Sequence, residues 1–451
     1  MENAIIDGGA HLEGAVRIQG SKNTIQKIVP STVAFPGVYR FTNVPEIHDT
    51  RAQLEILRYL GGGVARTADE LVIDTREMMF KEIPSLVAAQ STGTFLFAGA
   101  LLTRFGKARV FHPGGDDIGY RGVTWHLDAF RSLGATVETR RDHYQVDASR
   151  LQGTTIAFKK PTVNGTVNAI LASLNCEGET VLENTPMEPD IDNTVAFLNQ
   201  AGAHVTVGLG TVSIRGGGQP TGAASLAIIP DRNDVATFAI AAALCGGRVV
   251  LSPVIRTHVQ PLLDVFTSMG VRWEVISHGL EESLVIVGGG PFRPVAIEAG
   301  TFPMFSTDWG PMIEVLMTQA DGVSTLHELI FADRFKHVPH LERMGALIER
   351  FQPDVSPNVY SFDYVEGAEH KHALRITGSH PLASALIDAN DIRAGAALAL
   401  AALVANGQSR LKNYEQVRRG YQDFAERLQA LGASIHVAKE EDGQAGHSPH
   451  T

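Results

Sequence analysis

The sequence predicts a fold of the mixed α/β (α+β) class. Its 451 residues contain one pattern six times: a glycine that opens a β-branched run, followed by a helical run that ends near a second glycine. Because strands and helices alternate within each copy, the copies predict packed layers of sheet and helix. A pattern that recurs at a nearly constant spacing indicates one supersecondary unit used repeatedly.

Each copy begins with a predicted strand and ends with a predicted helix cap. Residues that favour extended backbone dominate the six opening runs, which lie at 37–44, 106–113, 178–185, 247–254, 322–329 and 407–414. A glycine after a helix accepts left-handed φ angles that crowd the Cβ of other residues. We expect this conformation at Gly61, Gly134, Gly202, Gly270, Gly345 and Gly432.

Two polar breaks predict where the chain crosses between two lobes of three units each. The first break is Gly20–Asn23 and the second is Pro230–Asn233. Residues 1–20 alternate apolar and polar side chains, so we expect edge strands that complete the second lobe. The predicted units are a first lobe (22–230), a second lobe (1–21 plus 231–437) and a disordered polar tail (438–451).

The composition argues against several functional classes. A net charge of −11 disfavours nucleic acid as a partner, since nucleic acid needs a basic surface. The only cysteines, Cys176 and Cys245, lie in apolar runs, which is typical of a reducing compartment such as the cytoplasm. No apolar run is long enough to predict a membrane span. The pairs His337–His340 and His370–His372 lack a third ligand at metal-like spacing, so surface or capping roles are expected and no metal site.

The second unit carries an inserted glycine-rich loop, His112–Arg121, with Asp116 and Asp117 inside it. A loop of this composition alone predicts a surface turn, but an insertion on one face of a repeat is a common place for function. The segment 90–94 precedes an apolar helical run and is typical of an anion-binding helix start, with a plain Ser/Thr cap as the alternative.

Charged residues recur at the mouths of the units. The cations are Lys22, Arg121, Arg232, Arg334 and Arg419. If the units pack as copies, these side chains converge, and a cluster of cations in an acidic protein predicts an anionic ligand. Surface salt bridges are the alternative for each cation alone. Two acids from different lobes, Asp116 and Asp308, suit paired proton transfers, with turn and helix-cap roles as alternatives.

Eight stretches, in order over both halves, match motifs of one enzyme family: 20–23, 113–122, 184–194, 230–238, 305–312, 331–346, 390–400 and 418–433. Through them the chain resembles the enolpyruvyl transferases, and the UDP-N-acetylglucosamine 1-carboxyvinyltransferases more closely than EPSP synthase. The resemblance implies an inside-out α/β barrel of two lobes, each with three βαβαββ-type repeats. It also implies cofactor-free transfer of the enolpyruvyl group of phosphoenolpyruvate to a hydroxyl of a uridine nucleotide, with UDP-N-acetylglucosamine expected first.

The resemblance implies roles for matching residues. Lys22, Arg121 and Arg419 would bind phosphoenolpyruvate, while Asp308 would deprotonate the acceptor hydroxyl. Asp116 would protonate C3; most of the family has a cysteine there, so its replacement implies insensitivity to fosfomycin, which alkylates that thiol. Acceptor contacts and charged cleft positions would be Asn23, Thr92, Trp125, Lys160, Thr162, Val163, Asp231, Arg232, Ile330, Arg334, Asp391 and Arg393.

Three departures from the family's motifs lie on the acceptor side. The family's Arg-Pro-Val-Asp-Leu reads RGVTW at 121–125, an expected arginine is absent near Thr92, and Val-Gly-Ala-Thr reads VNGT at 163–166. An acceptor such as UMP, in secondary metabolism such as nucleoside antibiotic biosynthesis, is therefore an alternative. Others are an inactive relative that only binds nucleotide and a structural repeat scaffold. The retention of Lys22, Asp308 and Arg419 together argues against the inactive relative, and a scaffold would not need charged loops that differ from unit to unit.

Overall fold

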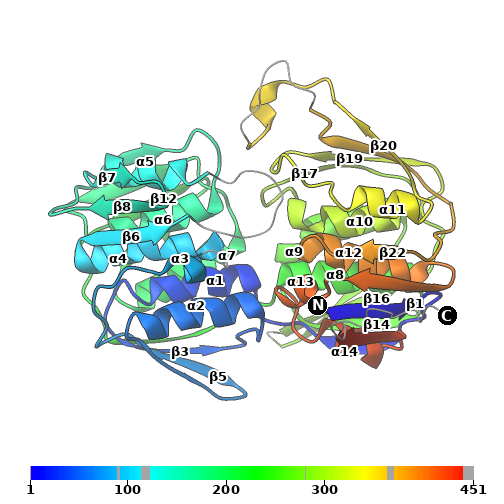
Figure 1. Ribbon diagram of the computed structural model, residues 1–451, viewed down its shortest axis with the longest axis horizontal. Helices are drawn as coiled ribbons and strands as arrows, with labels where there is room; N and C mark the ends of the chain where they lie inside the picture. Colours follow the sequence, from blue (N-terminus) through cyan, green and yellow to red (C-terminus); the bar gives the residue numbers. More distant parts are fainter. Residues whose placement is uncertain (1, 89–91, 113–121, 280, 363–369, 440–451) are drawn as a thin grey trace, which may run out of the picture.

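Strands and helices alternate along the chain in this computed structural model, which describes residues 2–88, 92–112, 122–279, 281–362 and 370–439. The described strands form six sheets of three to five strands each. The predicted mixed α/β class is confirmed. Figure 1 shows two lobes side by side, with the first and last described strands both in the second lobe.

Three sheets of the first lobe surround a group of packed helices (Figure 1). The strand orders are β13-β3-β5-β4, β6-β8-β7 and β11-β12-β10-β9. The strands are β3 (Val38–Thr42), β4 (Gly63–Arg66), β5 (Glu70–Asp74), β6 (Lys107–Phe111), β7 (Thr136–Thr139), β8 (His143–Asp147), β9 (Thr155–Ala157), β10 (Glu179–Glu183), β11 (His204–Val207), β12 (Thr211–Arg215) and β13 (Ala223–Ala227). The helices are α1 (Lys22–Ser31), α2 (His48–Tyr59), α3 (Ser85–Ala88), the 3-10 helix η1 (Thr92–Leu96), α4 (Phe97–Phe105), α5 (Thr124–Ser132), α6 (Val163–Ser173) and α7 (Pro189–Gln200).

The second lobe repeats this plan. Its strand orders are β22-β23-β1-β24, β15-β16-β14-β2 and β18-β17-β19-β21-β20. The strands are β1 (Glu2–Asp7), β2 (Gly14–Arg17), β14 (Arg248–Val254), β15 (Arg272–His278), β16 (Glu281–Val287), β17 (Ala296–Gly300), β18 (Phe305–Ser306), β19 (Val323–Glu328), β20 (Leu347–Phe351), β21 (Ala373–Thr377), β22 (Leu386–Asp388), β23 (Gln408–Lys412) and β24 (Ile435–Lys439). The helices are α8 (Arg232–Cys245), α9 (Arg256–Met269), η2 (Thr307–Trp309), α10 (Gly310–Met317), α11 (Val338–Arg343), η3 (Pro357–Val359), α12 (Ile392–Val404), α13 (Glu415–Arg418) and α14 (Phe424–Ala430).

The structure confirms the predicted roles of the opening glycine and the cap glycine in each repeat. Strands β3, β6, β10, β14, β19 and β23 each begin one residue after a predicted opening glycine. All six predicted cap glycines have φ between 85° and 111°. At Gly202 a Cβ would lie 1.9 Å from the Gln219 carbonyl oxygen, so both the backbone angle and the space require glycine.

Two details of the predicted ends are wrong. The prediction of edge strands in residues 1–20 is confirmed for β2, which lies at the end of its sheet. It is wrong for β1, which pairs with β23 on one side and β24 on the other. The tail does not begin at Ala438, because Ala438 and Lys439 pair with β1 as the end of β24. Both results have one cause: the N-terminal segment closes the last repeat of the chain, so it needs a partner strand on each side.

Each lobe has its own apolar core. One cluster is drawn from residues 25–228, and the other from residues 4–18 and 235–435. The central helices are almost wholly buried: of α12 only its last residue, Val404, is not. The strands alternate buried and exposed side chains, as in β3, so each sheet covers helices with one face. The domain boundaries at 22–230 and 1–21 plus 231–437 stay a prediction.

The two chain crossings between the lobes lie side by side. Ser21 N donates to Ile229 O at 2.7 Å, and Asp231 N donates to Gln19 O at 2.9 Å. Beside them, Glu46 N donates to Gln422 Oε1 at 2.9 Å and ties the first lobe to the loop before α14. These contacts place helix starts from both lobes next to the same gap.

Candidate active site

A cavity of about 650 Å³ lies between the lobes and is lined from both sides. Five helices and one 3-10 helix begin at its wall: α1 at Lys22, α5 at Thr124, α6 at Val163, α8 at Arg232, η2 at Thr307 and α12 at Ile392. Free backbone N–H groups and the positive end of the helix dipole favour anions at such starts. The fold itself therefore makes this cavity attractive to a phosphate or carboxylate.

Local capping explains why four of these helices begin where they do. Ser21 Oγ accepts from Thr24 N at 3.1 Å, and Thr162 Oγ1 accepts from Gly165 N at 3.3 Å. Asp231 accepts from Asn233 N, and Asp391 accepts from Arg393 N, both at 2.8 Å. A cap satisfies backbone donors that the helix leaves free.

Asp308 lies at the centre of the polar wall, between two arginines. Its Oδ1 is 3.1 Å from Arg334 and its Oδ2 is 3.1 Å from Arg393. Asn233 Nδ2 also donates to Oδ2 at 3.1 Å. Burial alone raises the pKa of Asp308, but Arg393, Arg334 and Lys22 together hold it far below its ordinary value. The carboxylate is therefore ionised and oriented.

Asp49 joins the two cations that come from opposite sides of the cavity. Its Oδ2 is 3.3 Å from Lys22 Nζ, and its Oδ1 is 3.5 Å from Arg419 Nε. Gln26 Nε2 donates to Oδ2 at 2.9 Å. Burial raises the pKa of Asp49, but Lys22, His48 and Arg419 outweigh it and bring the pKa to about 2. One buried carboxylate thus positions a cation from each lobe.

A second polar group lies deeper in the wall. Arg232 pairs with Glu188, both nearly fully buried, and Phe302 N donates to Glu188 Oε1 at 3.0 Å. Asp190 accepts from Ser21 Oγ at 2.7 Å. Lys27 is buried beside these acids, and burial lowers its pKa below the ordinary value. This network fixes Arg232 from the second lobe against carboxylates of the first.

A profile of one enzyme family matches residues 6–428, under the description EPSP synthase (3-phosphoshikimate 1-carboxyvinyltransferase). A UDP-N-acetylglucosamine 1-carboxyvinyltransferase 2 of Carboxydothermus hydrogenoformans is 35% identical over 96% of this chain and 99% of its own. A UDP-N-acetylglucosamine 1-carboxyvinyltransferase of Desulforapulum autotrophicum is also 35% identical, over 97% of this chain and all of its own. The chain belongs to the EPSP synthase family. It is therefore an enolpyruvyl transferase.

Solved structures of the family share the fold. The enolpyruvyl transferase NikO from Streptomyces tendae superposes with a TM-score of 0.83, at 26% identity, over 98% of this chain and 99% of its own. An EPSP synthase from Acinetobacter baumannii superposes with a TM-score of 0.75 at 18% identity, over 97% of this chain and all of its own. At that identity the second comparison supports the fold alone.

Most residues matched to the family's motifs line the cavity. They are Lys22, Asn23, Trp125, Lys160, Thr162, Val163, Arg232, Asp308, Ile330, Arg334, Arg393 and Arg419. Asp231 and Asp391 are not among the lining residues; their carboxylates cap α8 and α12 instead. Thr92 begins η1, and its side chain lies outside what the structure describes. Asp116 and Arg121 lie outside the residues that the structure describes.

Sequence reasoning missed several polar residues of the cavity wall. Asp49, Glu188, Asp190 and Lys27 line it, and none of them is among the residues that the sequence predicts for the site. Glu188 and Asp190 lie within a motif stretch, 184–194, so the signal was present. Lys27 lies one helical turn beyond Asn23, a spacing that places both on one face of α1.

The predicted surface or capping roles of the histidines are wrong in part. His337 is fully buried, and its Nε2 lies 2.6 Å from Glu314 Oε2 in the core of the second lobe. His372 is buried against Phe362, with ring centroids 4.4 Å apart. Among the described residues no group of three metal-ligating side chains has the geometry of a metal site. No described helix is long and apolar enough to cross a bilayer.

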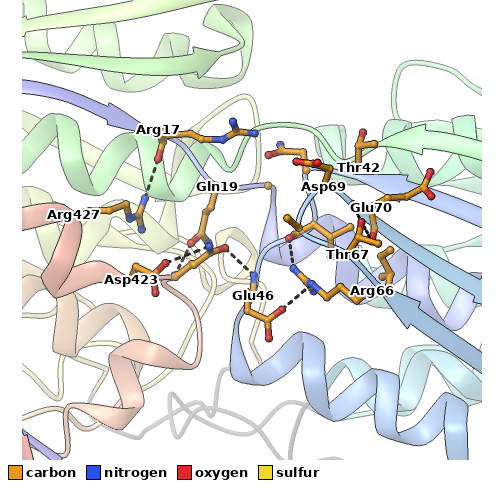
Figure 2. A pocket seen from close by; sticks show the side chains of 16 residues that line it. Arg17, Gln19, Thr42, Glu46, Arg66, Thr67, Asp69, Glu70, Asp423 and Arg427 are labelled. Carbon is orange, nitrogen blue, oxygen red and sulfur yellow. Dashed lines mark hydrogen bonds and ion pairs between the residues drawn. The ribbon is translucent and has the colours of Figure 1, made fainter. Parts of the chain in front are cut away.

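A larger cavity, of about 780 Å³, lies on the hinge side of the lobes (Figure 2). Two of its arginines already have carboxylate partners. Arg66 Nε is 2.8 Å from Glu46, and Arg427 is 2.7 Å from Asp234. None of the helices whose starts line the cavity between the lobes begins there. The smaller cavity is therefore the better candidate for an anionic substrate.

Proposed function

We propose that the protein transfers the enolpyruvyl group of phosphoenolpyruvate to a hydroxyl of a uridine nucleotide and releases phosphate. The observation that supports this most is the cluster of cations from both lobes around Asp308 in one cavity. UDP-N-acetylglucosamine is the first acceptor proposed, because two relatives at 35% identity carry that name.

Lys22 and Arg419 would hold phosphoenolpyruvate, with Arg121 as a third ligand. Both described residues line the cavity and share Asp49 as a partner. A trianionic substrate would compete with that single carboxylate for two cations, and it would gain the helix starts as further partners. Asp231 and Asp391 would act through the helices they cap and position Arg232 and Arg393.

The proposed reaction is an addition followed by an elimination. Asp308 takes the proton of the acceptor hydroxyl, whose oxygen attacks C2 of phosphoenolpyruvate, while Asp116 gives a proton to C3. The C2–O bond to phosphate then breaks, and phosphate leaves with the proton that Asp308 had taken up. C3 returns a proton to Asp116 to form the enol ether. Bound phosphoenolpyruvate would place negative charge near Arg334 and Arg393, which raises the pKa of Asp308 and makes it a better base.

The acceptor half of the cavity would be formed by Asn23, Trp125, Lys160, Thr162, Val163 and Ile330, all of which line it. A second acceptor, a shorter nucleotide such as UMP, is favoured by one specific observation. Gly122, Thr124 and Trp125, which replace family motif residues, also line the cavity. A half-buried tryptophan offers a flat apolar face to a nucleobase.

We further propose that each lobe is an inside-out barrel of three repeats, with boundaries at 22–230 and at 1–21 plus 231–437. Buried central helices and half-exposed outer sheets support this arrangement. It places the helix starts of both lobes at the gap between them. The active-site loop 112–121 belongs to the first lobe in this proposal.

Phosphate release from phosphoenolpyruvate tests the proposed function. We expect release with UDP-N-acetylglucosamine or with UMP, and none when the acceptor is omitted. The ratio of kcat/KM for the two acceptors identifies the substrate. Tight binding of uridine nucleotides with no phosphate release for any of them would contradict the proposal and indicate a protein that only binds nucleotide.

Replacement of Asp116 tests the proton donor. Asp116→Ala is expected to lower kcat by about 10²–10⁴-fold, because a general acid contributes about that much. The neighbouring Asp117→Ala is the matched comparison. Normal turnover by Asp116→Ala in the phosphate-release assay would remove Asp116 from the mechanism. Fosfomycin is expected to leave wild-type turnover unchanged, since the position lacks a thiol.

A further inference from the structure

One hairpin of the second lobe is far longer than its counterparts. In the first lobe the connections β4–β5, β7–β8 and β11–β12 are the three-residue turns 67–69, 140–142 and 208–210. The connection β20–β21 occupies the same place in its repeat, yet it spans 352–372. A repeat that closes in three residues throughout the first lobe does not need this length, so the segment is an insertion on the scaffold.

The described part of this inserted hairpin reaches the cavity. Figure 1 shows it extending from the top of the second lobe toward the first. Ser361 and Phe362 line the cavity together with Lys159 and Lys160 of the first lobe. Lys160 Nζ donates to Phe362 O at 2.8 Å, so the inserted hairpin and the first lobe are in direct contact.

A small apolar cluster separate from both cores anchors residues 360–362. Leu329, Tyr360 and Phe362 form it, with Ile330 packed against them. Ser361 N donates to Leu329 O at 2.8 Å. Ile330 belongs to this anchor and also lines the cavity. Residues 329–330 and 360–362 therefore form one continuous wall of the cavity.

Aromatic contacts reinforce the anchor. The Tyr360 ring stacks on Phe362 at 4.8 Å, and its hydroxyl lies 3.0 Å from His327 Nε2. His372, at the other end of the inserted hairpin, packs on the Phe362 ring. The position of Phe362 is therefore fixed by side chains of both ends of the inserted hairpin and by β19.

We propose that this wall is a specificity-determining element of the acceptor site, and that Ser361, Phe362 and Lys160 together bind the phosphoryl-bearing part of the nucleotide. The proposal rests on the proposed function for the identity of the acceptor. The Ser361 hydroxyl and the remaining Lys160 ammonium protons are suitable donors to phosphoryl oxygens. The Phe362 carbonyl orients the ammonium group, and the apolar anchor holds both donors in place.

The wall and the proposed phosphoenolpyruvate ligands line the same cavity but belong to different elements of the fold. Its residues come from the β20–β21 connection and from the segment after β19, and Lys160 precedes α6, whereas Lys22 begins α1 and Arg419 follows α13. Loss of the wall is therefore expected to weaken acceptor binding while leaving phosphoenolpyruvate binding unchanged. A general destabilisation of the fold would weaken both.

The test compares three variants with wild type: a trimmed protein in which a Gly-Leu-Gly turn, as at 208–210, replaces 352–372; Phe362→Ala; and Lys160→Ala. For the trimmed protein we expect Kd for UDP-N-acetylglucosamine and for UMP, measured by calorimetry, to rise about tenfold or more. KM for phosphoenolpyruvate is expected to stay within about twofold. Val355→Ala, an exposed position of the same hairpin that does not line the cavity, is the control.

A double-mutant combination separates a shared site from two unrelated ones. If Lys160 acts with the inserted hairpin, Lys160→Ala added to the trimmed protein raises the acceptor Kd by much less than it does in wild type. Unchanged acceptor Kd in the trimmed protein and in Phe362→Ala overturns the inference. The acceptor Kd, measured by calorimetry, tests the role of the wall even if the wild-type protein releases no phosphate. Absence of phosphate release would contradict the proposed function but not the role of the wall. Absence of uridine nucleotide binding by wild type overturns both.

Discussion

At the scale of single residues, the candidate site is organised by carboxylates that hold cations in place. Asp308 orients Arg334 and Arg393, and Asp49 orients Lys22 and Arg419. Each ion pair is at least partly shielded from water, so its geometry is more persistent than that of an exposed pair. Substrate anions then enter a site whose cations are already aligned.

Asp308→Asn tests the proposed base. The amide keeps the shape of the side chain but cannot accept the hydroxyl proton, so kcat is expected to fall about 10²–10⁴-fold. Phosphate release under saturating substrates measures it. Asp264→Asn, at an exposed position of α9, is the control. Turnover of Asp308→Asn within a factor of two of wild type would assign the proton to another group.

Asp49 predicts an acid-dependent loss of stability. Its pKa of about 2 in the folded protein lies below the ordinary 3.8, so the carboxylate stabilises the fold above about pH 4. That contribution, of about 2 kcal/mol, is lost as the pH falls from 4 toward 2. Urea unfolding at pH 7 and pH 3 is expected to show a smaller pH dependence for Asp49→Asn than for wild type. Equal dependence in the two proteins would contradict the pairing of Asp49 with Lys22 and Arg419.

At the scale of elements, the repeat unit sets where each helix ends and each strand begins. The six cap glycines share one backbone conformation, and six strands open one residue after a glycine. These features follow from local chemistry, because left-handed φ favours glycine whatever surrounds it. They were therefore predictable from the sequence with little tertiary information.

Gly202→Ala tests this repeat chemistry. The substitution combines a φ of 111° with a Cβ only 1.9 Å from the Gln219 carbonyl oxygen, so a loss of about 2–4 kcal/mol of unfolding free energy is expected. Gly217→Ala is the matched control: it also has positive φ, 76°, but its Cβ meets nothing within 4 Å. The expected cost there is about 1 kcal/mol. If urea unfolding showed equal losses of unfolding free energy in the two variants, the backbone around Gly202 would accommodate the added Cβ at little cost.

Other elements could not be predicted from local patterns. The inserted hairpin at 352–372 has no sequence periodicity that predicts its role. Only the packing of Tyr360 and Phe362 places it at the cavity. Strand β1 was expected at an edge, because alternation does not say how many neighbours a strand has. His337 was expected near the surface, since the sequence does not reveal its partner Glu314 in the core.

At the scale of the whole molecule, two lobes of similar design bring the starts of their central helices to one gap. The sequence predicted the convergence of five cations from their places at the mouths of the repeats, and Lys22, Arg232, Arg334 and Arg419 line the cavity. The fifth, Arg121, lies outside the described residues. It did not predict which acids would position them, since these pairings depend on tertiary packing. Asp49 meets Lys22 through the packing of α2 on α1, and it meets Arg419 across the lobes. Glu188 pairs with Arg232 across the lobes. The hinge-side contact of Glu46 with Gln422 keeps the loop after Arg419 in register with the first lobe.

The central claim is that cations of both lobes bind one small phosphorylated acid in the cavity between them. A crystal structure with bound phosphoenolpyruvate measures this most directly. We expect its phosphate and carboxylate to lie within hydrogen-bond distance of Lys22 and Arg419, with Asp308 facing the acceptor side. Phosphoenolpyruvate bound in the hinge-side cavity, or bound without contact to either cation, would contradict the account.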